Sequence, residues 1–332
     1  IQEKLLEGKG PKNSGDFIAM LSARLFERME PIFQELDERL DNIAKVASSA
    51  NIIPAQLEFV DIAGLVKGAS KGEGLGNQFL ANIRETDAIL HVLRCFEDDD
   101  ITHVDGSVDP VRDAETIETE LMLADLESLQ KQIDNMGRKA KSGDKEAKAQ
   151  LDMMEAIKTL LEEGKPARIY TPDDDQKKQY AMLQLLSSKP VLYVCNVNED
   201  EASTGNAWTE KVETLAKEQG AEVVVICAAI ESEIAQLSSK EEKAEFLDSL
   251  GLTESGLDKI IRSSYKLLKL HTYFTAGPKE ARAWTIGKGY SAPQAAGLIH
   301  TDFQKGFIRA ETIAYDDYIA CNGEVGAKES GK

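Results

Sequence analysis

The feature that most constrains this chain is Asp61, which is followed three residues later by Gly64. Residues 57–60 read Leu-Glu-Phe-Val and predict a buried strand, and the segment 67–76 that follows is rich in glycine. A carboxylate at a strand end can reach the hydration shell of Mg²⁺, and a glycine amide can approach a phosphate because no side chain blocks it. The pattern predicts an α/β fold with a site for Mg²⁺ and the terminal phosphate of a nucleotide.

A second loop of the same kind follows residues 191–195, which also predict a strand. In guanine-binding proteins the corresponding loop reads N-K-x-D, and its Asp accepts hydrogen bonds from guanine. Here the loop begins with Asn196, Val197 stands in the Lys position and Glu199 stands in the Asp position. Adenine offers an acceptor at N1 and a donor at N6, so this loop favours adenine, read by backbone groups around Val197. A GTPase is the disfavoured alternative.

A third loop follows the predicted strand at 222–226 and begins Cys227, Ala228, Ala229, where GTPases carry S-A-K. The three loops, in this order, resemble the YchF/Obg-like ATPase family. The resemblance continues through residues 76–89 and 94–97, and residues 299–311 resemble that family's C-terminal TGS domain. It covers the chain from about residue 37 to the end.

The resemblance implies a P-loop NTPase-type (Ras-like) α/β sheet with an inserted α-helical coiled-coil hairpin and a C-terminal α+β, β-grasp-like TGS domain. It also implies ATP and Mg²⁺ as cofactors. Asp61 is expected to act on Mg²⁺ through water, Gly64 to approach the phosphate and Asn196 to tie the base loop to the phosphate loop. Ala228 is expected to face the base, whereas Glu199 is either a base reader or a solvated carboxylate.

No catalytic residue is identifiable. Leu65 occupies the place where Ras-like enzymes hold a catalytic Gln, and an apolar side chain cannot orient water. Ordinary packing of Leu65 is equally consistent with the sequence.

The phosphate cradle G-x-x-x-x-G-K-[ST] expected near the start of this fold is absent from the printed sequence. Such a cradle supplies about five hydrogen bonds at roughly 1–3 kcal/mol each. Losing even ~6 kcal/mol corresponds to about four decades of affinity. We therefore expect residues 1–36 to be an atypical segment in place of the cradle, and weak ATP binding by the chain as printed. The alternative function is a non-catalytic ribosome- or RNA-binding fragment or a pseudo-NTPase.

Helical periodicity predicts the inserted hairpin. Apolar residues at spacings of four and three form a coiled-coil seam on the outgoing helix, and a second set lines the returning helix. The first set is Met122, Leu126, Leu129, Ile133 and Met136, and the second is Leu151, Met154, Ile157 and Leu161. Gly137 and residues 142–144 predict the turn between them.

These patterns predict four regions. The strands are expected at 56–61, 87–95, 190–195 and 222–227, and a helix at 209–219. The regions are the segment 1–36, a nucleotide-binding domain of 37–111 and 171–272, the hairpin 112–170, and a TGS domain of 273–332 that is apparently truncated.

Composition and charge limit the class of protein and the partners that the chain can have. The 332 residues carry a net charge of −19, and 42% hydrophobic with 29% charged residues indicates a globular, cytoplasmic protein, expected to be a monomer, without a membrane span. Residues 131–148 contain six Lys/Arg and three Asp/Glu, a local excess of three positive charges. With the resemblance, this predicts contact with the ribosome, and with rRNA through Lys139, Lys141 and Lys145 at the hairpin tip and through the TGS domain.

Cys195 and Cys227 flank the nucleotide loops; redox sensing is one interpretation, and inert buried thiols are the other.

Overall fold

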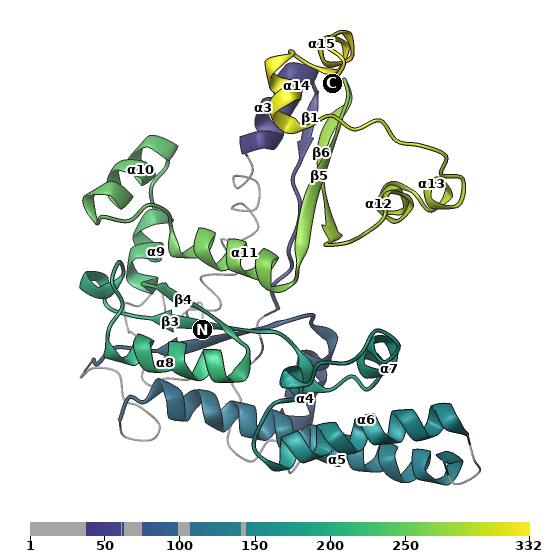
Figure 1. Ribbon diagram of the computed structural model, residues 1–332. Coiled ribbons are helices and arrows are strands. Elements are labelled where there is room, and N and C mark those ends of the chain that lie inside the picture. Colours follow the sequence, from purple (N-terminus) through teal and green to yellow (C-terminus); the bar gives the residue numbers. More distant parts are fainter. Residues whose placement is uncertain (1–37, 61, 63–74, 99–106, 141–143) are drawn as a thin grey trace. The chain divides into compact units, whose positions relative to one another are not determined.

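The computed structural model describes residues 38–60, 62, 75–98, 107–140 and 144–332, which fall into two compact units (Figure 1). One unit spans Val60–Leu267, and the other combines residues 38–59 with Leu268–Lys332. The first holds α4 (Leu75–Glu85), β2 (Ile89–Arg94), α5 (Pro110–Ala140), α6 (Lys145–Glu162), η2 (Ala167–Ile169), α7 (Lys177–Met182), η3 (Leu186–Ser188), β3 (Val191–Asn196), η4 (Glu199–Glu201), α8 (Ala207–Gln219), β4 (Glu222–Ile226), α9 (Ala228–Ile234), α10 (Lys240–Ser249) and α11 (Gly256–Leu267). The second holds α3 (Glu38–Ala47), β1 (Asn51–Ile53), β5 (Leu270–Ala276), β6 (Glu280–Gly287), α12 (Ala292–Ile299), α13 (Thr301–Lys305), α14 (Tyr315–Ala320) and α15 (Glu324–Glu329).

The first unit is built on a parallel sheet in the order β2-β3-β4. Every residue of β3 is buried, as expected for the central strand of a sheet covered on both faces. Alternate β3 residues Val191, Tyr193 and Cys195 pack with Val212 of α8 and Ala114 of α5. Helix α11 packs against β3 and β4 on the other face (Figure 1).

Helices α5 and α6 form the expected hairpin and lie side by side (Figure 1). Their shared core contains the predicted seam residues Met122, Leu129, Met154, Ile157 and Leu161. Asp144 caps α6, and its carboxylate accepts the backbone N–H groups of Glu146 and Ala147 at 2.9 and 3.2 Å. Helix α5 continues through Gly137 to Ala140, so Gly137 lies inside the helix rather than in the turn.

The second unit has a three-stranded sheet in the order β1-β6-β5, in which β1 is parallel and β5 antiparallel to β6. One face of this sheet packs through Ala281 and Ala283 on Leu40, Ile43 and Ala44 of α3. Residues 38–59 therefore join residues 268–332, which differs from the expected division that placed 37–111 in the nucleotide-binding domain.

The strand predicted at 56–61 is wrong for the residues that the structure describes. Residues 54–60 have no regular secondary structure, Val60 is 52% exposed, and the strand of this segment is β1 instead. The other predicted strands and the helix at 209–219 are confirmed within two residues. Among the described helices, none combines the length and apolar character that crossing a bilayer requires.

Candidate functional site

The carboxyl ends of β2, β3 and β4 meet at Asn196, which is only 2% exposed. The Asn196 carbonyl accepts the N–H of Cys95 at 2.8 Å. Its side-chain Oδ1 accepts the N–H of Ala228, the first residue of α9, at 2.9 Å. Asn196 therefore joins the loops after β3 and β4, the two loops expected to hold a base.

Val197 contributes to this edge through its backbone. Its side chain is 2% exposed and belongs to the core cluster that includes Leu93 and Cys195. Its N–H donates to the carbonyl of Ile226 at 2.9 Å, which ties the loop to the end of β4. Val197 therefore holds the loop in place through its backbone, while its side chain belongs to the core.

Glu199 is exposed and begins η4, beside the loop that follows β4. Burial raises the pKa of the Cys227 thiol, and the nearby carboxylates of Glu199 and Glu231 reinforce the increase. The Glu199 charge therefore acts on the residue that precedes Ala228. Ala228 itself is half-buried.

Asn206 supports the same edge and was not foreseen from the sequence. Its Nδ2 donates to the carbonyl of Cys95 at 2.7 Å and to Glu201 Oε2 at 2.9 Å. Its Oδ1 accepts the N–H groups of Trp208 and Thr209, so Asn206 also caps α8. The pattern of Asn followed three residues later by Thr, before an amphipathic segment, was the available signal.

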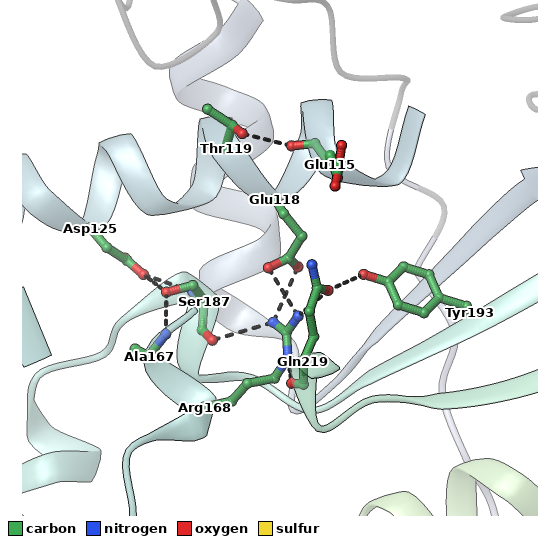
Figure 2. Close-up of polar contacts among 9 residues, drawn as sticks. All are labelled: Glu115, Glu118, Thr119, Asp125, Ala167, Arg168, Ser187, Tyr193 and Gln219. Atoms are coloured by element: carbon green, nitrogen blue, oxygen red, sulfur yellow. Dashed lines mark hydrogen bonds and ion pairs between the residues drawn. The ribbon is translucent and has the colours of Figure 1, made fainter. Parts of the chain in front are cut away.

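A buried polar network fixes β3 to the base of the hairpin (Figure 2). Arg168 Nη1 donates to Glu118 Oε1 on α5 at 3.1 Å, and Nη2 lies 3.0 Å from Glu118 Oε2. Arg168 also donates to the carbonyl and side-chain oxygens of Gln219, at 3.0 and 3.1 Å. Tyr193 of β3 donates to the same Gln219 Oε1 at 2.7 Å. The hairpin and the end of α8 are thereby bonded to one guanidinium, and β3 is connected to it through Gln219.

Asp125 makes a second connection between α5 and the segment that leads into β3. Its carboxylate accepts the N–H groups of Leu186 and Ser187 and the Ser187 hydroxyl, each at 2.7 Å. Burial raises the pKa of Asp125, and these hydrogen bonds offset part of the increase. Sequence reasoning missed this network because its members look like ordinary helix-surface and loop residues.

Family models match both ends of the described chain. A 50S ribosome-binding GTPase model matches residues 41–124. A model of the C-terminal part of YchF GTPases, described as a protein of unknown function, matches residues 270–332. Among curated proteins, the ribosome-binding ATPase YchF of Haemophilus ducreyi is 55% identical over 296 residues, covering 89% of this chain and 81% of the relative. The chain belongs to the YchF family.

Further YchF proteins are similar to this chain over the same share of its length. The ribosome-binding ATPases YchF of Haemophilus influenzae and Bacillus subtilis are 56% and 52% identical over 296 and 298 residues, each covering 89% of this chain and 81% of the relative. The solved structure of the Schizosaccharomyces pombe YchF GTPase matches with a TM-score of 0.78 at 36% identity, covering 89% of this chain and 80% of that chain. The expected P-loop GTPase-type α/β fold is confirmed, and a C-terminal domain is present.

Several predicted YchF site residues lie outside the described residues. They are Asp61, Gly64 and Leu65 at the phosphate end, Lys141 at the hairpin tip, and the side chain of Lys139. Lys145 is described and exposed in the first turn of α6. Within the described part of the chain, no group of three or more His, Cys, Asp or Glu side chains is placed to hold a metal ion.

The cysteines of the nucleotide edge are free and buried. The hydrogen bond of the Cys95 thiol to Cys195, followed by burial, raises the pKa of Cys95. Thiols with raised pKa values form little thiolate at neutral pH, which favours an inert thiol over a redox sensor at Cys227, and at its neighbour Cys95 as well. Cys195, the other cysteine in the redox interpretation, is buried.

Proposed function

We propose that this chain is a ribosome-associated, adenine-specific nucleotide-binding protein of the translation-factor class, and that hydrolysis of ATP is its activity. The observation that carries the proposal is the hydrogen bond from the Ala228 N–H to Asn196 Oδ1, which unites the two base loops. The names of the curated relatives, ribosome-binding ATPase YchF, support the partner and the nucleotide. The proposal places the protein in the cytoplasm as a monomer.

The residues at the base end fit a purine. Among the described residues, none accepts a hydrogen bond from Asn196 Nδ2, so this amide can serve a ligand or the phosphate loop. The Val197 side chain is committed to the core, which leaves its carbonyl as the acceptor for the adenine N6 donor. Guanine presents an acceptor at the corresponding position, so this arrangement supports adenine.

At the phosphate end, the proposal assigns Asp61 to the Mg²⁺ shell through water and Gly64 to the γ-phosphate. Bound ATP would supply the phosphoanhydride bond that is hydrolysed. Leu65 would leave the attacking water without a side chain to orient it. The lack of a G-x-x-x-x-G-K-[ST] run in the 332 residues implies weak phosphate binding by this polypeptide.

Calorimetric titration of the full chain with adenosine, guanosine and ATP tests the base site. We expect adenosine to bind more tightly than guanosine, and ATP to exceed adenosine by less than about tenfold. Asn196→Ala should lower adenosine affinity about tenfold because it leaves the Ala228 N–H unpaired. Glu199→Ala is the matched test of the exposed carboxylate. An unchanged adenosine affinity would show that Glu199 does not contact the base. Guanosine binding equal to adenosine binding would contradict adenine specificity.

A second candidate function is a ribosome- or RNA-binding module without catalysis. The basic hairpin tip favours it, since residues 131–148 carry six Lys/Arg against three Asp/Glu in a chain of net charge −19. Ribosome pelleting without nucleotide, over a salt titration, tests it. Reversal of charge at Lys139 and Lys141 together should weaken binding and flatten its salt dependence, whereas reversal at the exposed Lys211 and Lys217 of α8 should not. Equal ribosome binding by both double variants would show that the hairpin tip does not contact the ribosome.

A further inference from the structure

The β5–β6 ribbon of the second unit has one face buried and one face that carries aromatic and cationic side chains. Ala281 and Ala283 point to the buried face, which packs on α3. Because side chains alternate along a strand, Arg282 and Trp284 lie on the opposite face. The register places Tyr273 directly across from Trp284.

The aromatic rings of this face are fixed in position. The Tyr273 and Trp284 rings lie 6.4 Å apart with an interplanar angle of 13°, a stacked arrangement. Trp284 Nε1 donates to Thr275 Oγ1 at 2.9 Å, and the Tyr273 hydroxyl donates to the Ala295 carbonyl at 2.9 Å. The polar atoms of both rings therefore have hydrogen-bond partners. The two rings are already held in position, so ligand binding does not cost the entropy of fixing them.

Arg282 lies over this pair, with its guanidinium carbon 4.1 Å from the centre of the Trp284 ring. Within the described part of the chain it forms no ion pair, although the protein as a whole is strongly acidic. A guanidinium placed over an indole face keeps its own outer side for stacking and N–H groups for a phosphate.

The charge around this face is complementary to a polyanion. Residues 268–291 contain Lys269, Lys279, Arg282 and Lys288 against Glu280, an excess of three positive charges in a chain of net charge −19. Lys269 and Lys288 are exposed at one end of the ribbon, where the Lys288 N–H donates to the Lys269 carbonyl at 2.7 Å. Lys288 directly follows the last residue of β6 and comes four positions after Trp284, about 13 Å along an extended chain, so that one extended strand of nucleotides spans both.

We propose that this face of the β5–β6 ribbon, centred on Arg282, Trp284 and Tyr273, is a stacking platform for unpaired bases of single-stranded RNA. Planar aromatic and guanidinium groups stack on bases without sequence preference, and flanking lysines neutralise the phosphates. The inference rests on the proposed function in one respect: association with ribosomes makes RNA the polyanion that the face meets. A duplex hides its base faces and fits this surface poorly.

Binding of a twelve-nucleotide single-stranded RNA to the full chain, followed by fluorescence anisotropy, tests the platform. Arg282→Ala should weaken binding about tenfold, since stacking contributes roughly 1–3 kcal/mol per base. Arg282→Lys keeps the positive charge but removes the planar guanidinium, so it should weaken RNA binding nearly as much. Lys305→Ala, which removes one exposed charge from α13, is the matched control and should change affinity less than threefold. In a Trp208→Phe background Trp284 is the only tryptophan, and RNA should quench its emission.

Wild-type affinity in Arg282→Lys, or equal binding of duplex RNA, would overturn the platform. The quenching titration needs no substitution in the platform, so it decides the question even if Arg282→Ala fails to fold. Ribosome pelleting in parallel separates the two proposals. Oligonucleotide binding that depends on Arg282 supports the platform even without ribosome binding, which would count against the proposed function alone.

Discussion

Arg168 and Glu118 form an ion pair in which the side chains are only 5% and 3% exposed. The pair joins η2 to α5, so the hairpin is bonded at its base to the sheet that carries the nucleotide loops (Figure 2). Arg168 also reaches Gln219, which accepts the Tyr193 hydroxyl of β3. Movement of the hairpin base relative to β3 would break these bonds together.

Removing one partner of this pair should be strongly destabilising. Arg168→Met leaves the Glu118 carboxylate buried without its counter-charge, and we expect a loss of about 3–5 kcal/mol in the free energy of unfolding. Urea unfolding of Arg168→Met, Glu118→Gln and the double variant measures this. The double variant should lose less than the sum of the single ones. Additive losses would show that the two side chains do not interact in the folded protein.

The difference between what was and was not predictable follows from sequence separation. The apolar residues of the hairpin seam recur every three or four positions, and β3 ends in a short polar loop. Local sequence patterns therefore predicted both. Arg168 bonds Glu118 across 50 residues, and Ser187 bonds Asp125 across 62. Such pairs leave no periodic pattern. The packing of α3 on β6 spans more than 230 residues and was missed for the same reason, as was the strand β1.

His91 should make stability depend on pH. Burial, with a smaller contribution from the Arg168 charge, lowers the pKa of His91 from 6.5 to about 4. The unfolded chain then binds more protons than the folded one between pH 6.5 and 4, so stability falls as the pH falls through this window. The shift sets a limit of about 3 kcal/mol, and because His91 is half-buried rather than fully buried, about 1–2 kcal/mol is the expected loss.

Urea unfolding at several pH values from 7 to 4.5, for the parent and for His91→Gln, measures this contribution. The variant lacks the titrating ring, and its stability should fall less over the same range. Tyr193, whose ring centre lies 5.7 Å from that of His91, is not substituted in either protein. Parallel pH profiles would contradict the assignment.

The four cysteines should differ in reactivity. Cys95, Cys195 and Cys227 are buried, whereas Cys321 is half-buried. With a thiol reagent such as DTNB under native conditions, we expect one fast thiol, and three that react only at the rate of unfolding. Cys321→Ser should abolish the fast phase. Rapid modification of a second thiol would support the redox interpretation of the nucleotide edge.

Two glycine-to-alanine substitutions should have opposite effects. At Gly256, the first residue of α11, an added Cβ would lie 2.8 Å from the Ile226 side chain and 3.0 Å from a carboxylate oxygen of Glu231. That carboxylate accepts the Gly256 N–H at 2.6 Å and holds the start of the helix beside β4. Gly256→Ala should therefore cost about 1–3 kcal/mol through overpacking.

Gly137 is the matched control, because it lies inside α5 and an added Cβ meets nothing within 4 Å. Alanine loses less backbone entropy than glycine when a helix forms, so Gly137→Ala should stabilise the protein by about 0.5–1 kcal/mol. Thermal unfolding of both variants measures the difference. Destabilisation by Gly137→Ala would mean that α5 does not continue through Gly137, and a neutral Gly256→Ala would mean that α11 does not approach β4 this closely.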